Sequence, residues 1–549
     1  MQQVTKRLLV VVIIILLSIN TACTFNKNES PAPPAPKTVI KPGGQLRYGS
    51  LQEPNTLNPL MSDLLATAEF GKLIFSGLVT TNDKGEWIPD LAMEVPAVAN
   101  GGVSSDGLTV TYRLKQGVAW HDGIPFTAED VTYTWQFIMN RQANVMSREG
   151  YDKIVTVDVP NPYTAVVKFR EYYAPFLTLF ATILPKHKLE NAVDMNKAPF
   201  NREPVGTGPF KFKEWRYGEA LFLDANTSYF RGKPNLDGII FKVIPDSTMA
   251  ISQLKANEVD IVSNVNFAQY EQVKAIPGVR TVTTPTMVWE HFDFNLDNAL
   301  FQDIQVRKAV ALAIDRQAIV TNVFKGMAVP AVGDQSPLSW AYNPTQYSAA
   351  RSINGAKELL IKAGWQLGPD EIFAREGRKL SFSLAIPAGN KEREQVAAAI
   401  AAQLKEAGIL AEVRPIDAPA FFSDVLKNRR FETALFGWVA GLDPDNLDLW
   451  HSRKIPFAGN NYEGQNYAGW RNPEVDKLTD QGAKIVDVGA RKEIYFRIQD
   501  LIREEVPVIP LYFHVNIDAV QETVANYQPG PSPAGSLWNA WQWGFVSSQ

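Results

Sequence analysis

Apolar residues recur along this chain with the period of strands in some segments and of helices in others. Alternation at every second position indicates strands in "TVTYRLKQGVAW" (109–120) and "LSFSLAI" (380–386). The apolar run "FETALF" (431–436) also has the pattern of a strand. Because strand and helix patterns alternate from about Gln45 onward, we predict an α/β protein.

The segment "TAEDVTYTWQFIMNR" (127–141) carries the signals of a helix start. Thr127 is a good N-cap, Asp130 occupies the third helical position, and Phe126 stands where it can pack onto Val131. The apolar residues that follow have the spacing of one helix face. We therefore predict a helix that begins after Thr127.

Two segments have the order strand, helix, strand with short connections. The first runs from "IIFKVIP" (239–245) to "VDIV" (259–262). The second joins the strand at 380–386 to "ILAEVRPI" (409–416) through the amphipathic helix "KEREQVAAAIAAQLKEAG" (391–408). Such links imply a right-handed crossover between adjacent parallel strands. Because the two units lie in opposite halves of the chain, we expect two α/β lobes with a ligand cleft between them.

The N-terminus has the pattern of an export signal. Lys6 and Arg7 precede ten apolar residues, Leu8–Leu17, which are too few to span a bilayer. A zone of small and polar residues follows, as at a cleavage site. We predict that residues 1–22 are a signal peptide.

Cys23 is the only cysteine, so no disulfide can form within the chain. Its place resembles the lipobox of bacterial lipoproteins, in which the thiol receives a diacylglyceryl group, although Asn20 stands where Leu is usual. The alternative is an ordinary signal peptide with an incidental cysteine. The Pro-rich, polar stretch that follows cannot build a core, so we expect residues 23–44 to be a lipid-anchored flexible tether.

Composition limits the possible function classes. A chain of 549 residues exceeds what one core usually holds, and its net charge of −4 with dispersed basic residues argues against nucleic acid as a partner. No zinc-binding histidine spacing, catalytic thiol or GxSxG sequence is present, and we expect no catalytic residue, metal or cofactor. Two weak matches are "GTGPF" (206–210), which is more typical of a turn, and "DPD" (443–445), which imitates the DxD of metal-dependent glycosyltransferases.

The stretch "GWVAGLDPDNLDLWH" (437–451) combines indole rings with carboxylates directly after the predicted strand at 431–436. A ligand site at the carboxyl end of a strand would explain this combination. An acidic surface loop whose tryptophans belong to the core would explain it as well.

Seven stretches in collinear order resemble the extracellular solute-binding proteins of ABC importers in the peptide/nickel class, family 5. They are "PNTLNP" (54–59), "LKQGVAWHDGIPFTAEDVTYTW" (114–135), "VGTGPFKFKEW" (205–215), "LKANEVDI" (254–261), "FQDIQVRKAVALAIDRQAI" (301–319), "NPEVDKL" (472–478) and "VPVIPLY" (506–512).

The resemblance implies a two-lobed periplasmic-binding-protein fold, type II-like, with an extra inserted domain and a hinged cleft. Lobe I would join residues 45–83, 203–290 and 507–549 and carry the inserted domain at 84–202. Lobe II would comprise residues 291–506. Two crossings of the chain would form the hinge.

The resemblance also implies ligand-binding residues. In peptide binders of this family the loop containing "GW" faces the cleft, and an Asp three residues after the Trp pairs with the peptide's α-ammonium group. Here that position is Gly441, so Asp443 is the candidate carboxylate, although Asp443 could instead cap a turn before Pro444. The other candidates are Glu53, Trp438, Val439, Trp450 and His514, and the two tryptophans could equally be core residues.

We therefore expect the substrate-binding component of an ABC importer, which captures oligopeptides and delivers them to permease subunits. It would be a monomer without enzymatic activity, anchored through acylated Cys23 at the outer face of the cytoplasmic membrane or in the periplasm. The alternatives are the same fold binding an oligosaccharide or a nickel complex, a DxD-type transferase, and a sensory or chaperone role.

Overall fold

An 11-stranded mixed sheet contains strands from both halves of the chain. Its strands follow the order β18 (Leu410–Ile416), β17 (Ser381–Pro387), β19 (Thr433–Val439), β12 (Val279–Phe294), β20 (Val508–Gln521), β11 (Ile261–Val262), β2 (Gln45–Ser50), β10 (Gly238–Val243), β9 (Ala220–Ala225) and β8 (Phe210–Arg216). A further strand, β13 (Val329–Pro330), pairs with β20 beside this order. The predicted α/β class is confirmed.

The computed structural model describes residues 39–345, 350–532 and 535–547. The residues from Ile40 onward form one compact unit. The predicted signal peptide, Cys23 and most of the predicted tether lie outside the described residues. Within the described ranges, no helix is both long enough and apolar enough to cross a membrane.

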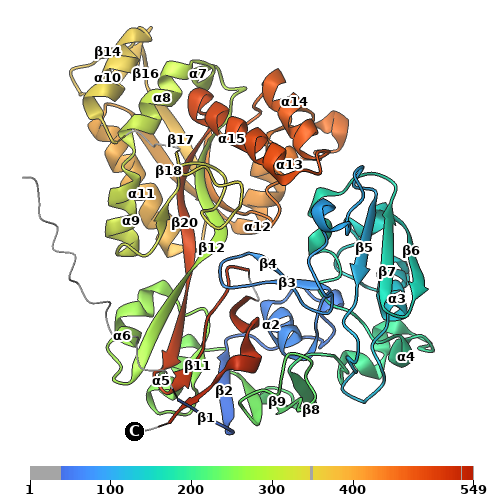
Figure 1. Ribbon diagram of the computed structural model, residues 1–549. Coiled ribbons are helices and arrows are strands. Elements are labelled where there is room, and N and C mark those ends of the chain that lie inside the picture. The colour runs from blue at the N-terminus through green and yellow to red at the C-terminus, as the bar shows by residue number, and fades with distance from the viewer. Residues whose placement is uncertain (1–38, 346–349, 533–534, 548–549) are drawn as a thin grey trace, which may run out of the picture. The chain divides into compact units, whose positions relative to one another are not determined.

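Some helices lie beside this sheet and join its strands, whereas others, such as those at 128–139 and 186–189, lie outside it (Figure 1). The helices are α2 (Leu65–Ile74), α3 (Ala128–Met139), α4 (Lys186–Leu189), α5 (Ser247–Lys255), α6 (Tyr270–Lys274), α7 (Ala299–Gln302), α8 (Ile304–Ala313), α9 (Arg316–Phe324), α10 (Ile353–Lys362), α11 (Lys391–Glu406), α12 (Ala418–Ala420), α13 (Leu447–Trp450), α14 (Pro473–Gly482) and α15 (Val488–Glu505). Helix α3 begins after Thr127 as predicted, and the Asp130 carboxylate accepts a hydrogen bond from the Thr127 N–H at 3.0 Å.

The second strand–helix–strand prediction is confirmed, because β17 and β18 pair in parallel and α11 connects them. The first is only half right. Strands β10 and β11 are parallel to a common neighbour, β2, which lies between them. Strand β2 comes from the start of the described chain, and its insertion separates two strands that the sequence predicts to be adjacent.

Residues 78–183 have a hydrophobic core of their own, with Trp120, Phe126 and Phe180 among its buried side chains. The small sheet of this part consists of β5 (Thr109–Arg113), β7 (Thr164–Phe169) and β6 (Ile154–Asn161) in that order. The predicted strand at 109–120 is thus shorter, ending at Arg113. The remaining small sheets are β3 (Val79–Thr81) with β4 (Trp87–Pro89), β1 (Ile40–Lys41) with β22 (Gly544–Val546) and β21 (Val524–Ala525), and β14 (Gln366–Leu367) with β15 (Phe373–Arg375) and β16 (Arg378–Lys379).

Strands β12 and β20, the longest of the described strands, run side by side between the part that contains α8, α9 and α11 and the part that contains α5, α6 and β2 (Figure 1). Their antiparallel ladder is interrupted midway. Pro285 pairs with Val515 and Trp289 with Phe513, so three residues of β12 face one residue of β20. Such a bulge bends a strand locally.

Thr286 fills the interruption in the ladder. Its buried hydroxyl donates to the His514 carbonyl at 3.1 Å and accepts from the Val288 N–H at 3.1 Å. The side chain therefore replaces ladder hydrogen bonds that the bulge removes, which buried backbone groups require.

Candidate functional site: a cleft with two adjoining cavities

Two large cavities adjoin between the 78–183 part and the segments that follow β19. The first has a volume of about 850 Å³, and we call it the apolar cavity because its wall includes Trp87, Val98, Phe176, Met287, Leu338 and Trp340. The second has a volume of about 1040 Å³, and we call it the polar cavity because most of its charged and amide side chains come from residues 147–153, 334–335, 443–454 and 480–484.

The two cavities share one wall. Tyr172, Pro175, Leu442 and Asp443 contribute to the lining of both. Each cavity alone lies at the upper end of the range for small-molecule sites, roughly 300–1,000 Å³. An elongated ligand that passes this shared wall could occupy both.

Strand β19 ends at the polar cavity, and its last two residues, Trp438 and Val439, line that cavity. Val439 is 62% exposed, and half-buried Trp438 packs edge-on against Phe436 and Tyr467 with ring centroids 6.2 and 6.1 Å away. Both residues are thus available at the cavity wall, and their contact with ligand stays a prediction.

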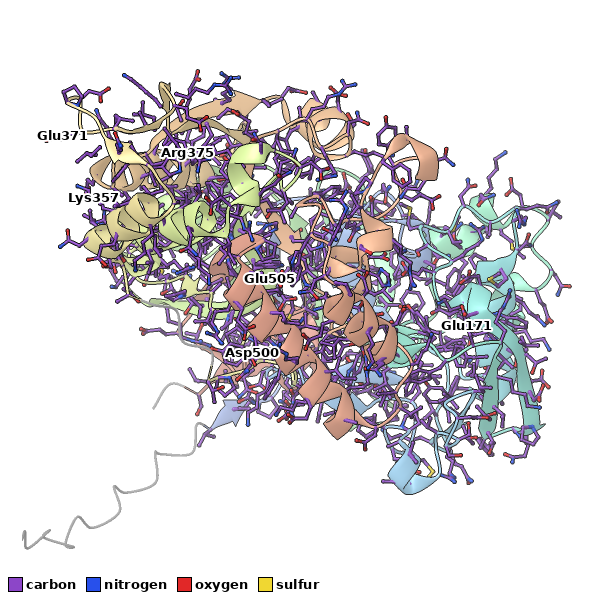
Figure 2. The ribbon with its side chains drawn as sticks, turned by 90° about the horizontal axis from the view of Figure 1, so that it is seen from above. Glu171, Lys357, Glu371, Arg375, Asp500 and Glu505 are labelled. Atoms are coloured by element: carbon purple, nitrogen blue, oxygen red, sulfur yellow. The ribbon has the colours of Figure 1, made fainter. Side chains whose placement is uncertain are left out.

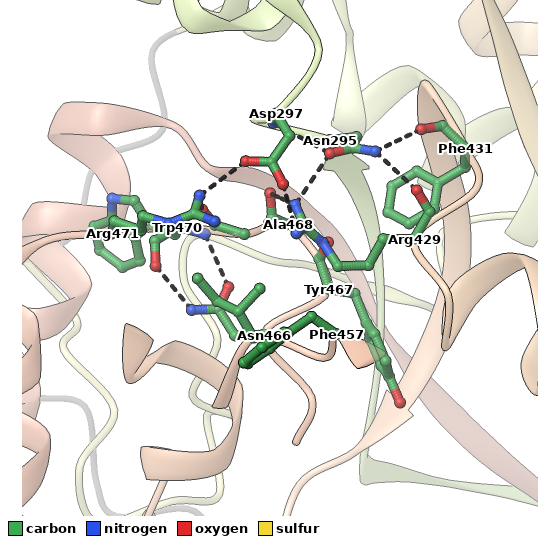
Figure 3. Close-up of polar contacts among 12 residues, drawn as sticks. Asn295, Asp297, Arg429, Phe431, Phe457, Asn466, Tyr467, Ala468, Trp470 and Arg471 are labelled. Atoms are coloured by element: carbon green, nitrogen blue, oxygen red, sulfur yellow. Dashed lines mark hydrogen bonds and ion pairs between the residues drawn. The ribbon is translucent and has the colours of Figure 1, made fainter. Parts of the chain in front are cut away.

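The backbone that carries Tyr467 is fixed by a charged network (Figure 3). Arg429 donates to the Tyr467 carbonyl at 2.8 Å, to Asp297 at 2.7 Å and to Asn295 at 3.1 Å. A Cβ atom at Gly469, which has a φ of +74°, would lie 2.0 Å from the Arg429 guanidinium, so only glycine fits this turn. These hydrogen bonds therefore hold in place the backbone of Tyr467, whose ring packs against Trp438.

Asp443 already has a cationic partner. Arg491 on α15 donates to its two carboxylate oxygens at 2.9 and 2.7 Å. The Arg491 side chain is 3% exposed and the Asp443 side chain is 13% exposed. Burial alone would lower the pKa of Arg491, but the hydrogen bonds and the charge of Asp443 raise it above its ordinary value. A ligand ammonium at Asp443 would have to compete with this pair, so the amine-binding role of Asp443 stays a prediction.

Trp450 lies in the core, 4% exposed, and lines neither cavity. Its indole N–H donates to Asp334 Oδ2 at 2.8 Å, and the Asn446 amide donates to the same oxygen at 2.9 Å. This geometry gives Trp450 a packing and positioning role, and the predicted direct contact with ligand receives no support from it. Asp334, which does line the polar cavity, was not predicted from the sequence.

His514 lies on β20, opposite the interruption in its ladder with β12. Its Nε2 is 3.2 Å from Glu290, which is 1% exposed and also bound by Arg393 at 2.6 and 3.1 Å. Burial alone would raise the pKa of Glu290, but its bonds with His514 and Arg393 lower it. A Cβ atom at Gly437 would lie 2.7 Å from Glu290 Oε1, so the glycine before Trp438 makes room for this buried pair.

Glu53 lies beside the β8–β9 hairpin. It accepts hydrogen bonds from the Trp215 indole at 3.0 Å and from the Gly218 N–H at 2.8 Å. Of the predicted ligand residues, the structure brings together Trp438, Val439 and Asp443 at one cavity. The others, Glu53, Trp450 and His514, line neither cavity.

The opposite wall of the cleft is the segment 171–178, which the sequence reading passed over. The N–H groups of Glu171, Tyr172 and Tyr173 form no hydrogen bond with any described residue, and the same holds for Gly441 and Leu442 on the facing loop. Figure 2 labels Glu171, the first residue of this segment, and also Asp500 and Glu505, which lie on α15. Adjacent tyrosines before Ala-Pro were the available signal, since aromatic pairs in a loop are typical of binding surfaces.

The two weak motif matches have structural explanations. The Gly208 N–H donates to the Ile74 carbonyl at 2.7 Å, and a Cβ atom at Gly206 would lie 1.9 Å from that carbonyl oxygen. The GTG sequence is therefore a tight crossing over the end of α2. In the DPD sequence (443–445), Asp443 is bound by Arg491 and Asp445 accepts from the Leu447 N–H. Among the residues that the structure describes, no group of three or more His, Cys, Asp or Glu side chains is arranged to hold a metal ion.

Comparison with known proteins gives consistent matches over nearly the whole chain. "Oligopeptide-binding protein AppA" of Bacillus subtilis is 32% identical over 553 residues, covering 98% of both chains. The solved structure of AppA with a nonapeptide superimposes with a TM-score of 0.67 at 31% identity, over 93% of this chain and 100% of that one. NikZ from Campylobacter jejuni, solved with Ni(L-His), gives a TM-score of 0.70 at 26% identity, over 91% and 99%.

The sequence model of the bacterial extracellular solute-binding proteins, family 5, matches residues 86–454. This range contains the strands from β12 to β19 and most of the residues that line the polar cavity. The two-lobed fold that the resemblance implied is shared with the solved structures. The chain therefore belongs to the bacterial extracellular solute-binding proteins of family 5.

Proposed function

We propose that this protein is the substrate-binding component of an ABC importer and that its ligand is an oligopeptide. The observation that carries this proposal is the pair of facing segments, 171–173 and 441–442, whose N–H groups have no partner among the described residues. An extended peptide can use such groups as an added strand does, because its carbonyls recur at regular intervals whatever its side chains are.

The size of the cleft supports an oligomeric ligand. Cavities of about 850 and 1040 Å³ meet at Tyr172 and Asp443. The relatives AppA and NikZ are described with a nonapeptide and with Ni(L-His), respectively. The free N–H groups favour the peptide, whereas the described residues offer no cluster of metal-binding side chains.

In this proposal the protein binds without turnover, works as a monomer outside the cytoplasm, and hands its ligand to permease subunits. Lobe I would comprise residues 45–83, 203–290 and 507–549, with the inserted domain at 84–202, and residues 291–506 would form lobe II. An acyl group on Cys23 would anchor the chain to the membrane through the 23–44 tether, since the sole cysteine of the chain follows the predicted export signal.

Calorimetry with the purified protein tests peptide recognition. A peptide should bind more tightly than its analogue with one central amide replaced by an ester, because the ester carbonyl is the weaker acceptor for the free N–H groups. Equal affinities at every replaced position would contradict recognition through the backbone. Binding of an oligosaccharide or of nickel–histidine, with no heat from any peptide, would replace the proposed ligand.

A further inference from the structure

A small cavity lies apart from the cleft, where several distant segments of the chain meet. Its volume is about 20 Å³, and its wall comes from the end of α2 and the residues after it, from β3, from the residue after β4, and from the connections before β8 and after β9. None of these described residues lines the apolar or the polar cavity. A cavity needs roughly 10–15 Å³ to hold one water molecule, so this one has room for a single small ion.

Three cationic side chains surround one carboxylate at this cavity. Lys72 and Arg231 line it together with Asp90, which is 7% exposed. Lys115 lies beside them, because its ammonium donates to the Asp90 carbonyl and is 5.1 Å from the centre of the Phe230 ring. Asp90 is the one acidic side chain in the described wall, so the positive charges outnumber the negative charge.

The Asp90 carboxylate is already engaged at both oxygens. Its Oδ1 accepts from Arg231 at 2.9 Å, and its Oδ2 accepts from the Gly77 N–H at 3.1 Å. Lys72 is half-buried and forms no hydrogen bond or ion pair with any described residue. Burial lowers the pKa of the Lys72 ammonium, since the charge of Asp90 compensates only in part. The ammonium therefore lacks an acceptor at a place where it is partly removed from water.

Arg231 provides a second donor without a partner. One of its terminal NH₂ groups donates to Asp90 and to the Pro89 carbonyl at 2.7 Å, whereas its Nε–H is buried and has no acceptor among the described residues. A buried donor that carries charge is costly when it is left without an acceptor. Lys72 and Arg231 belong to the wall of one cavity, so a single acceptor placed there could serve both.

We propose that this cavity binds one chloride ion. A small anion would accept from Lys72 and Arg231 and would offset the positive excess, which a water molecule cannot do. A carboxylate or a phosphate is too large for the volume. The ion would connect α2 with the segments that follow β4 and β9, and it would thereby stabilise the junction of the 78–183 part with the rest of the chain. This site is separate from the proposed peptide function.

Two measurements on the purified protein test the proposal. Crystals soaked in sodium bromide should show one anomalous peak beside Lys72 and Arg231, because bromide can replace chloride. In solution, sodium chloride in place of sodium gluconate at constant ionic strength should raise the unfolding temperature by about 1–3 °C. Gluconate and sulfate do not fit the cavity, so sulfate should not reproduce the effect of chloride.

Lys72→Met removes the ammonium that has no partner. The variant should lose both the bromide peak and the chloride-dependent shift, and in gluconate it should unfold at a higher temperature than wild type, since an uncompensated charge is gone. Lys242→Met is the matched control. Lys242 is also half-buried, but it donates to Gln253 at 2.9 Å and does not line the cavity, so this variant should keep the peak and the shift.

Three results would overturn the inference. No bromide peak and equal unfolding temperatures in chloride and gluconate would mean that water alone occupies the cavity. A peak without a chloride-dependent shift would indicate an adventitious ion only. A shift of the same size in wild type and Lys72→Met would be a general salt effect. Each of these results leaves the peptide proposal untouched, because calorimetry tests that proposal separately.

Discussion

Arg491 donates hydrogen bonds to both carboxylate oxygens of Asp443, at 2.9 and 2.7 Å, and thereby connects the loop after β19 to α15. The same guanidinium donates to the Gly482 carbonyl at 2.9 Å and to the Tyr495 hydroxyl at 3.1 Å. It also lies 5.3 Å from the centre of the Trp340 ring. The ion pair thus shapes the wall that the two cavities share.

Removing Asp443 should destabilise the protein strongly. Asp443→Asn leaves Arg491, which is 3% exposed, without its counter-charge, and the free energy of unfolding should fall by roughly 3–5 kcal/mol. Urea unfolding measures this change. Asp448→Asn is the control. The Asp448 side chain, which pairs with Lys454, is 55% exposed, so this pair should contribute about 0–1 kcal/mol. Equal, small losses in both variants would contradict a structural role for the Asp443–Arg491 pair.

Stability should depend on pH through Glu69. Glu69 is 1% exposed and accepts from the Tyr48 hydroxyl at 2.9 Å; burial raises its pKa to about 8. The folded protein therefore keeps a proton that the unfolded chain releases above the ordinary pKa of 4.5, so stability falls as pH rises from there to about 8. Between pH 6 and 8 the loss should approach about 1.4 kcal/mol per pH unit.

Glu69→Gln should remove this slope. The window of pH 6–8 isolates Glu69, because the neighbouring buried Asp518 has its pKa raised only to about 6. Unfolding free energies of wild type and variant, measured by urea at several pH values, should lie closest at low pH and diverge as the pH rises, because only the wild type loses stability. Parallel curves for the two proteins would mean that Glu69 is ionised in the folded state at neutral pH.

Thr286 should contribute to the hinge through its hydroxyl. Thr286→Val keeps the shape but leaves the Val288 N–H and the His514 carbonyl without this partner, and the free energy of unfolding should fall by about 1–3 kcal/mol. Thr283→Val on the same strand is the control, since Thr283 is exposed. If ligand closes the hinge, small-angle scattering should also show a different change in radius of gyration for Thr286→Val. Identical stability and identical scattering in both variants would contradict this role.

The proposed anchor can be tested separately from binding. Cys23→Ser removes the only thiol that could carry a lipid, so the protein should move from the membrane to the soluble fraction with its peptide affinity unchanged. Fractionation and mass spectrometry of the mature N-terminus provide the readout. A variant that stays with the membrane, beside a wild type without lipid, would contradict the lipoprotein prediction.

Local patterns predicted the local parts of this fold. The start of α3 follows from Thr127 and Asp130, which act within one helical turn, and the β17–α11–β18 unit follows from two strands joined by one helix. Strand β2 separates β10 from β11 because it arrives from about 190 residues earlier along the chain, and no pattern within 239–262 encodes that partner.

The site was predictable to a similar degree. The position of Trp438, Val439 and Asp443 at one cavity follows from a strand that ends on polar residues. The partner of Asp443 lies 48 residues away on another helix, and the carboxylate held by Trp450 lies 116 residues away, so neither contact has a local signal. Trp450 looked like a ligand platform because an indole beside carboxylates fits a binding loop and a buried hydrogen bond equally well.

Mass spectrometry of the ligand released by denaturing the purified protein tests the central claim most directly. The claim is that the cleft binds oligopeptides through backbone groups of 171–173 and 441–442. It predicts a mixture of peptides of varied sequence at close to one peptide per protein. A single sugar or a nickel complex in their place, at the same stoichiometry, would contradict it.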